Sequence, residues 1–270
     1  MNDKLKVAIA GISGAMGQSI ALACTQNRAF EIVACVDKAD SGAIGNSLGG
    51  ILNGTNSDVT ISSDIASSCA IADVFIDFTA PEASLHALES LRATSVKSVI
   101  IGTTGFTPEQ DTEVKQFSDR FVIVKSGNFS LGVNLLAQLV ERASHILRED
   151  WDIEIVEAHH RRKVDAPSGT ALLLGAAAAS GRGKELDELR LSMREGISDA
   201  RKLGGIGFSA IRGGGVIGEH DVRFESESES LVLSHKAHDR TIFAKGALAA
   251  AKWSVNKEPG LYTMRDVLEF

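Results

Sequence analysis

Residues 5–27 read LKVAIAGISGAMGQSIALACTQN, which joins an apolar run, three glycines spaced three apart and a segment of helical periodicity. The apolar run predicts a β-strand over Leu5–Ala10, and the segment after the glycines predicts a helix that ends near Asn27. A strand, a glycine-rich turn and a helix in this order are typical of the first βαβ unit of a parallel sheet. The fold is therefore expected to be α/β.

The same alternation continues through the first half of the chain. Further strands are predicted at Ile32–Val36, Val74–Phe78, Val99–Ile101 and Phe121–Val124, with helices at Pro81–Ala93 and Pro108–Phe117. Such alternation is typical of a Rossmann-type doubly wound parallel sheet. Asp40–Thr60 interrupts the pattern, because it is rich in Gly, Ser and Asn, and it is expected to form a mobile connection at the carboxyl edge of the sheet.

The pattern changes after Asn128, which predicts a second domain. The elements expected there are helices at Leu131–Leu147 and Gly169–Ala179 and strands at Ile153–Ala158, Phe208–Arg212, Val216–Phe224 and Leu231–His235. The last three strands are expected to be antiparallel, because their spacings are too short for helical crossovers. Thr241–Ser254 returns to helical periodicity. We therefore expect a dinucleotide-binding domain of residues 1–130 and 241–270, and an α+β domain of residues 131–240, with a mixed or antiparallel sheet, for substrate binding and oligomerisation.

The composition is that of an ordinary globular protein, with 44% apolar residues, 23% charged residues and a formal net charge of −7. No segment reaches the roughly 18 uninterrupted apolar residues of a membrane helix, and the N-terminal residues lack a secretory pattern, so we expect a cytoplasmic protein without a membrane partner. The negative charge argues against a nucleic-acid partner. Three widely spaced cysteines, Cys24, Cys35 and Cys69, are expected to be buried thiols.

The glycine-rich turn is a candidate pyrophosphate site, because free amides and the helix dipole favour an anion there. The candidate residues are Gly11, Ile12, Ser13, Gly14, Ala15, Met16 and Gly17. The spacing G-x-x-G-x-x-G is weak evidence alone, and a tight turn is the alternative. Asp37 strengthens it, because an acid at the end of the second strand binds the adenosine ribose hydroxyls. Adjacent Lys38 would offset the repulsion of a 2′-phosphate, so NADH and NADPH both stay open as cofactors.

Two further loops follow predicted strands at the carboxyl edge of the sheet, where ligands bind in open α/β folds. Gly102, Thr103 and Thr104, which precede Gly105, are candidates to hold the nicotinamide half of the cofactor. The loop of Ser126, Gly127, Asn128 and Phe129 is a candidate for contacts to the carboxamide. For either loop taken alone, simple turn chemistry is the alternative.

Residues 157–170, EAHHRRKVDAPSGT, are the most informative segment for chemistry. Five consecutive cationic or titratable residues stand between an apolar strand and a helix start, in an otherwise acidic protein. Ser168, Gly169 and Thr170 begin that helix, and its free amides would form a cradle suited to a carboxylate. A solvated charge run is the alternative. A zinc site is disfavoured, because H-x-x-x-H and H-E-x-x-H spacings are absent and no cysteine is near, so no metal is expected.

The segment E-x-H-H-x-x-K-x-D-A-P-S-G-T is similar to the signature of the dihydrodipicolinate reductase family. The family's other marks occur in the same order: G-x-x-G-x-M-G at Gly11–Gly17, G-T-T-G at Gly102–Gly105, S-x-N-[FM]-S-x-G-V-N at Ser126–Asn134 and R-x-G-x-x-x-G-x-H at Arg212–His220. Collinear agreement of several motifs is much stronger evidence than any one of them.

The resemblance implies a homotetramer that uses NADH or NADPH to reduce a small cyclic dicarboxylate, 4-hydroxy-tetrahydrodipicolinate, to tetrahydrodipicolinate in the diaminopimelate route of lysine biosynthesis. It also implies that His159 acts as general acid/base and Lys163 as proton donor. The groups implied to hold the substrate carboxylates are His160, Lys163, Ser168, Gly169 and Thr170. Arg240 would add a planar guanidinium, which suits carboxylate geometry. Glu157 is expected to orient or balance this cluster.

Two other functions stay open at this point. Another two-domain nicotinamide-dependent dehydrogenase, acting on an amino acid or a semialdehyde, would share the first half but lack the H-H-x-x-K and P-S-G-T pair. A non-catalytic nucleotide sensor would keep the fold without the proton donors. The cationic segment at residues 159–163 disfavours both.

Overall fold

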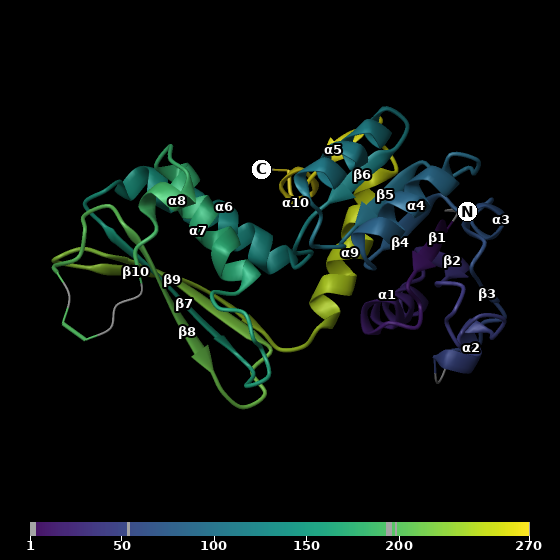
Figure 1. The fold of residues 1–270 in the computed structure, drawn as a ribbon, viewed down its shortest axis with the longest axis horizontal. Helices are drawn as coiled ribbons and strands as arrows, with labels where there is room; N and C mark the ends of the chain where they lie inside the picture. The colour runs from purple at the N-terminus through teal and green to yellow at the C-terminus, as the bar shows by residue number, and fades with distance from the viewer. Residues whose placement is uncertain (1–3, 53–54, 193–195, 198, 270) are drawn as a thin grey trace. The chain divides into compact units, whose positions relative to one another are not determined.

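The computed structural model describes residues 4–52, 55–192, 196–197 and 199–269. The chain divides into two compact units, whose elements are labelled in Figure 1. One unit takes the chain up to Ser130 together with Thr241–Glu269, and the other takes Leu131–Arg240. Within the described ranges, none of the helices combines the length and apolarity that crossing a membrane requires.

The first unit is built on seven parallel strands in the order β11-β6-β5-β4-β1-β2-β3. The strands are β1 (Leu5–Ala10), β2 (Phe30–Val36), β3 (Ile61–Ser62), β4 (Val74–Asp77), β5 (Ser98–Ile101), β6 (Val122–Lys125) and β11 (Gly260–Tyr262). The chain winds outward from β1 in one direction and from β4 in the other. The carboxyl ends of these two strands therefore form the switch point where such sheets bind ligands.

Helices cover both faces of this sheet, because successive strand residues point to opposite sides. The face that presents Val7 and Ile9 packs against α1 (Ala15–Thr25), α9 (Thr241–Ser254) and α10 (Met264–Val267). The face that presents Ala8 and Val99 packs against α3 (Ile65–Ser68), α4 (Pro81–Leu91) and α5 (Pro108–Gln116), which continues into the 3-10 turn η1 (Phe117–Asp119). The predicted doubly wound α/β sheet is confirmed.

Two strands and three short α-helices of this unit were not predicted from the sequence, and α3 and α10 are two of these helices. Strands β3 and β11 are two and three residues long and lack an extended apolar pattern. The segment expected to be a mobile connection contains α2 (Leu48–Ile51), and a bridge between Ser47 and Thr60 closes it against β3. The three cysteines are buried free thiols, as predicted, and burial raises each pKa to about 12.

The second unit is a four-stranded mixed sheet in the order β10-β9-β7-β8. Its strands are β7 (Asp152–His159), β8 (Ile206–Arg212), β9 (Gly218–Glu225) and β10 (Ser230–Ala237). The helices are α6 (Leu131–Leu147), α7 (Gly169–Gly181) and α8 (Leu186–Leu189). Ile153, Ile155 and Phe224 pack against α6 and α7 on one face of the sheet.

The structure corrects which strands are neighbours in this unit. β9 is antiparallel to both β7 and β10, but β8 pairs in parallel with β7 and lies on its other side. The prediction looked only at the short spacing between β8 and β9 and treated them as neighbours. The helices α7 and α8 supply the long crossover that a parallel β7–β8 pair needs.

Candidate active site

The glycine-rich turn has the backbone geometry of a phosphate-binding turn. Gly11 has a φ of +64°, which favours glycine, and a Cβ at Gly17 would lie 2.3 Å from the carbonyl oxygen of Gly11. Helix α1 therefore begins directly against the turn, with Gly14 as its N-cap and without a side-chain cap from the described residues. Its first amides are free for an anion. Ile12 is fully buried, and its backbone N–H donates to the carbonyl oxygen of Val36 at 3.4 Å, so the structure does not present this predicted residue to a ligand.

Asp37 lies at the end of β2 beside this turn. Its carboxylate accepts hydrogen bonds from the backbone N–H groups of Ser13 (2.7 Å) and Lys38 (2.9 Å). The Lys38 ammonium pairs with Asp40 at 3.2 Å, and both side chains are exposed. The structure thus brings Asp37 to the glycine turn, as expected for a group that binds a ribose, while Lys38 points to an acidic neighbour.

A cavity of about 460 Å³ opens between the ends of β1, β2 and β4 and the helix α4. Gly11, Asp37 and Thr79 line its polar side, and Phe75 and Ala83 belong to its apolar side. A polar rim with an apolar wall fits the adenosine half of a dinucleotide. The residues of the first unit therefore fit a nicotinamide dinucleotide cofactor.

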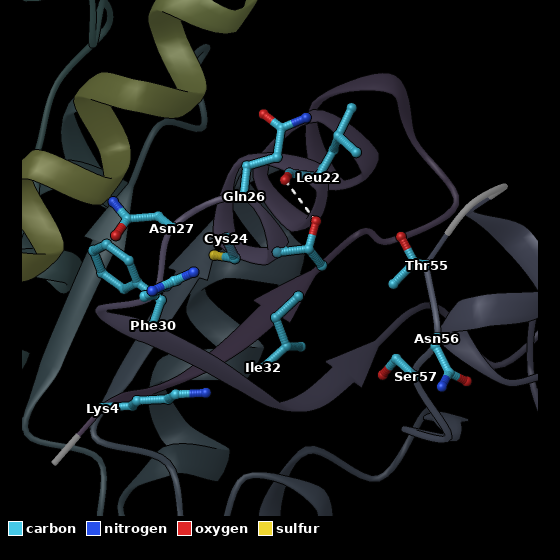
Figure 2. A pocket seen from close by; sticks show the side chains of 12 residues that line it. Lys4, Leu22, Cys24, Gln26, Asn27, Phe30, Ile32, Thr55, Asn56 and Ser57 are labelled. Carbon is cyan, nitrogen blue, oxygen red and sulfur yellow. Dashed lines mark hydrogen bonds between the residues drawn. The ribbon is translucent and has the colours of Figure 1, made fainter.

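A second cavity of about 580 Å³ lies at the opposite edge of the same sheet (Figure 2). Lys4 and Phe30, which line it, stand at the amino ends of β1 and β2, and Thr55 and Asn56 close it from the loop beyond α2. None of the predicted site residues lines it. Ligands of open parallel sheets bind at the carboxyl edge, so this cavity is not the cofactor site.

The loops that follow β4, β5 and β6 are fastened to one another. Thr103 is buried, and its hydroxyl oxygen accepts the backbone N–H of Thr79 at 2.9 Å. The rings of Phe78 and Phe129 lie 5.2 Å apart. Asp77 is also buried, which raises its pKa, and its carboxylate accepts the Thr79 hydroxyl at 2.5 Å.

These contacts divide the predicted cofactor residues of the two loops into two groups. The side chains of Thr103 and Phe129 hold the loops together and lie inside the protein. Thr104 and Gly127 are exposed and accessible to a ligand. In the second loop the Ser126 hydroxyl donates to the carbonyl of Asn128 at 2.8 Å, which fixes the turn.

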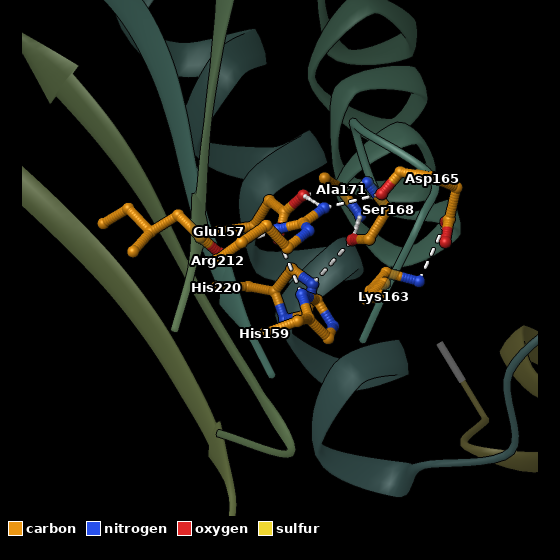
Figure 3. Close-up of polar contacts among 9 residues, drawn as sticks. Glu157, His159, Lys163, Asp165, Ser168, Ala171, Arg212 and His220 are labelled. Carbon is orange, nitrogen blue, oxygen red and sulfur yellow. Dashed lines mark hydrogen bonds and ion pairs between the residues drawn. The ribbon is translucent and has the colours of Figure 1, made fainter. Parts of the chain in front are cut away.

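Glu157 is the centre of the polar cluster in the second unit (Figure 3). Its carboxylate is buried and accepts four hydrogen bonds: two from Arg212 (both 2.7 Å), one from His159 Nδ1 (2.6 Å) and one from the Ser168 N–H (3.1 Å). Burial alone would raise the pKa of Glu157, but the hydrogen bonds from Arg212, His159 and Ser168 outweigh it and lower the pKa. Glu157 is therefore ionised at neutral pH.

His220 lies against His159 from the neighbouring strand β9, with ring centroids 5.1 Å apart. Its Nε2 is hydrogen-bonded to the Ser168 hydroxyl at 3.0 Å, and the same hydroxyl accepts the N–H of Ala171 to cap α7. Burial, followed by the charge of His159, lowers the pKa of His220 to about 4. A neutral imidazole therefore supports the start of α7.

Lys163 stands on the loop between β7 and α7, where its ammonium pairs with Asp165 at 2.8 Å. The start of α7 is formed by Ser168, Gly169 and Thr170, and a Cβ at Gly169 would meet open space. This opening lets a ligand approach the first amides of the helix.

His160 and Arg240 complete the set of predicted residues in this unit. Burial, followed by the charges of Arg162 and Arg240, lowers the pKa of His160. Arg240 is exposed. Among the described residues, no group of three or more His, Cys, Asp or Glu side chains could hold a metal ion.

Two residues of this cluster, Arg212 and His220, were not predicted as site residues. The sequence carried a signal for them, because they begin and end the segment R-x-G-x-x-x-G-x-H. What was missing was the pairing of their strands with β7, which places Arg212 beside His159 and His220 beside Glu157.

Comparison with known proteins covers nearly the whole chain. A family model described as "Dihydrodipicolinate reductase, N-terminus" matches residues 5–129, and one described as "Dihydrodipicolinate reductase, C-terminus" matches residues 132–268. A 4-hydroxy-tetrahydrodipicolinate reductase of Cereibacter sphaeroides is 47% identical over 268 residues, which are 99% of each chain. One of Caulobacter vibrioides is 48% identical over 271 residues, covering all of this chain and 99% of its own.

Solved structures agree with these matches. A dihydrodipicolinate reductase from Paenisporosarcina, described as dipicolinate bound, superposes with a TM-score of 0.76 at 25% identity and covers 97% of this chain and 98% of its own. An amine dehydrogenase from Mycobacterium smegmatis, at 14% identity and a TM-score of 0.61 over 96% of this chain and 94% of its own, shares the fold alone. Because both family models and full-length relatives match, this chain belongs to the dihydrodipicolinate reductase family.

Proposed function

We propose that this chain reduces 4-hydroxy-tetrahydrodipicolinate to tetrahydrodipicolinate with NADH or NADPH, in the diaminopimelate route of lysine biosynthesis. Relatives named for this reaction match along the whole chain at 47–48% identity. The main support for the proposal is that the family match includes the segment in which His159, Lys163 and the start of α7 form a polar cluster. A nucleotide sensor would not need such proton donors.

The cofactor is assigned to the first unit. The amides at the start of α1, in the turn Gly11–Gly17, are assigned to the pyrophosphate, and Asp37 beside them is assigned to the ribose hydroxyls. Thr104 and the backbone of Ser126–Phe129 are assigned to the nicotinamide half. When bound, the reduced nicotinamide supplies the hydride for the reaction. Lys38 would exchange Asp40 for a 2′-phosphate when NADPH is used.

The substrate is assigned to the second unit, because its two carboxylates need cations and free amides. The amides at the start of α7 form one carboxylate site, supported by the charge of Lys163. His160 and Arg240 are assigned to the other carboxylate. The Paenisporosarcina reductase that superposes on this chain is described as bound to dipicolinate, a cyclic dicarboxylate, which supports this choice of ligand.

His159 and Lys163 are assigned to proton transfer. In the net reaction the ring gains one hydride and one proton and loses one water. Lys163 carries an ammonium that can deliver the proton once the hydride has arrived, and solvent then restores it. His159 uses Nδ1 for Glu157, so Nε2 is the nitrogen that can exchange a proton with a reacting group.

We also infer a cytoplasmic homotetramer without a nucleic-acid partner. The net charge of −7 opposes phosphate binding over a broad surface. The exposed side chains of Ile211 and Val232 on the sheet of the second unit support assembly through that sheet. Light scattering after gel filtration tests the assembly, and a monomer at working concentrations would contradict it.

The reaction is tested by following the absorbance of the reduced nicotinamide. Freshly made product of dihydrodipicolinate synthase is supplied with NADH and NADPH in parallel. Substrate-dependent oxidation of either cofactor is the expected result. No oxidation by protein that binds NADH would instead point to another dehydrogenase substrate or to a sensor.

A further inference from the structure

Glu157 has no hydrogen-bonding capacity left for substrate. A carboxylate has about four acceptor positions, and Arg212, His159 and Ser168 occupy four. It is also 1% exposed. Burying a charged group is costly, and a fully paired buried ion pair is often no more stabilising than apolar residues of the same size. We therefore expect a role of this ion pair other than stabilising the fold.

One consequence of this pairing is a fixed tautomer of His159. An ionised carboxylate can only accept, so the 2.6 Å contact requires a hydrogen on His159 Nδ1. Nε2 then remains the basic nitrogen of the neutral ring. If the contact with Glu157 were lost, the proton could reside on either nitrogen, and the ring could turn about its side-chain bond.

The second consequence concerns the loop that carries Lys163. Arg212 binds both oxygens of Glu157 and also donates to the backbone carbonyl of Asp165 at 2.6 Å. Asp165 in turn pairs with Lys163. The same carboxylate accepts the N–H of Ser168, the N-cap of α7. One ion pair thus holds the loop at two points between Lys163 and the start of α7.

We propose that Glu157 and Arg212 are a positioning pair, which sets the His159 tautomer and holds the Lys163 loop and the α7 start in register for proton transfer and carboxylate binding. The proposal rests on the function proposed above, in which His159 and Lys163 move protons. Neither member touches substrate. Arg212 reaches Glu157 because β8 pairs in parallel with β7, with Arg212 opposite His159.

The other charged or titratable groups around His159 do not replace this pair. His220 approaches from β9, but it is neutral above about pH 4 and hydrogen-bonds Ser168. The ammonium of Lys163 and the carboxylate of Asp165 form an ion pair on the loop. His160 follows His159 in the chain, and its pKa is lowered. Glu157 is thus the acceptor that His159 Nδ1 uses in this site.

The test compares Glu157→Gln with the double variant Glu157→Gln/Arg212→Leu. The single variant leaves the Arg212 charge buried and can lose stability, whereas the double variant removes both charges. Glu219→Gln is the matched control, because Glu219 is a carboxylate on β9 opposite Ala158, paired with Lys236 on the other side of the sheet from Glu157. Thermal unfolding gives the folded fraction of each protein.

Two readouts are needed, one with substrate and one without. In the ligand-free protein, nitrogen chemical shifts from long-range proton–nitrogen spectra report the His159 tautomer, with His159→Gln used to assign its signals. We expect Nδ1–H in the wild type and in Glu219→Gln, and a mixture of tautomers in both Glu157 variants. In the assay we expect kcat per folded molecule to fall roughly 100-fold in both, with the Kd for NADH unchanged.

Unaltered His159 nitrogen shifts in both Glu157 variants, or kcat per folded molecule within about twofold of the wild type, would overturn the proposal. The tautomer measurement needs neither substrate nor turnover. A wild type that fails to reduce 4-hydroxy-tetrahydrodipicolinate while showing the Nδ1–H tautomer would therefore refute the proposed function and leave the positioning of His159 in place.

Discussion

Replacing Gly17 by Ala should disable the cofactor turn. A Cβ at this position would lie 2.3 Å from the carbonyl oxygen of Gly11, 2.8 Å from its carbonyl carbon and 2.9 Å from the Cα of Ile12. All three neighbours are backbone atoms, so no side chain can move away. Real Cβ contacts are rarely shorter than 3.4 Å, so α1 and the turn would have to separate by about 1 Å.

The magnitude follows from two opposing effects. Alanine within a helix is favoured over glycine by up to about 1 kcal/mol, so an effect of propensity alone would stabilise the protein. Overpacking a site that cannot relax costs about 1–3 kcal/mol. If the displaced turn loses a comparable part of its cofactor contacts, the Kd for NADH rises roughly 5- to 150-fold.

The assay is titration of NADH by fluorescence, combined with thermal unfolding. Gly42→Ala is the matched control, because a Cβ there would meet nothing within 4 Å and Gly42 lies outside the predicted cofactor residues. It should leave the Kd unchanged. A Gly17→Ala protein that binds NADH within about threefold of the wild type and melts at the same or a higher temperature would refute the steric argument.

Three further predictions concern the two units separately. Lys163→Ala should lower kcat roughly 100-fold with an unchanged Kd for NADH, because the proton donor is lost while the glycine turn is intact; near-normal turnover would remove Lys163 from the reaction. Asp37→Asn should shift the ratio of kcat/KM values from NADH toward NADPH by about tenfold, since the repulsion of a 2′-phosphate falls; an unchanged ratio would separate Asp37 from the ribose. The pKa of His220 is lowered from 6.5 to about 4 in the folded protein, so as the pH falls the unfolded chain takes up this proton first. The neutral His220 side chain therefore contributes roughly 3 kcal/mol at most to the free energy of unfolding. This contribution is complete above about pH 6.5 and is lost as the pH falls toward 4. Urea unfolding across this range should therefore show a steeper pH dependence for the wild type than for His220→Gln, and parallel curves would contradict the assignment.

Local patterns were sufficient for the longer strands and the glycine-rich turn of the first unit. The strand Leu5–Ala10, its glycines and Asp37 each carry a signal within a few residues, and the parallel sheet follows from the repeated alternation. Strand β11 could not be found in this way, because it has three residues and its partner β6 precedes it by more than a hundred residues. Its pairing depends on tertiary structure alone.

In the candidate active site, too, residues within one short segment could be predicted, whereas contacts between distant segments could not. His159, Lys163 and the α7 start could be predicted, because they lie within one short segment. Arg212 is far from Glu157 in the chain, and the contact depends on the parallel pairing of β7 with β8, which the spacing of the strands did not predict. Thr103 and Phe129 were predicted as cofactor residues by position, but only the packing shows that their side chains point inward.

The first unit is formed by two separate segments of the chain, and this affects how it folds during synthesis. On the ribosome, strands β1 to β6 emerge first, but α9, which covers the face of Val7 and Ile9, and β11, which pairs with β6, follow only after Leu131–Arg240 has been synthesised. At about 5–20 residues per second, translation of that insertion takes on the order of 6–22 s. For this time the nascent sheet has an apolar face that α1 covers only in part and an open edge at β6, so we expect the growing chain to bind chaperones until its last thirty or so residues arrive.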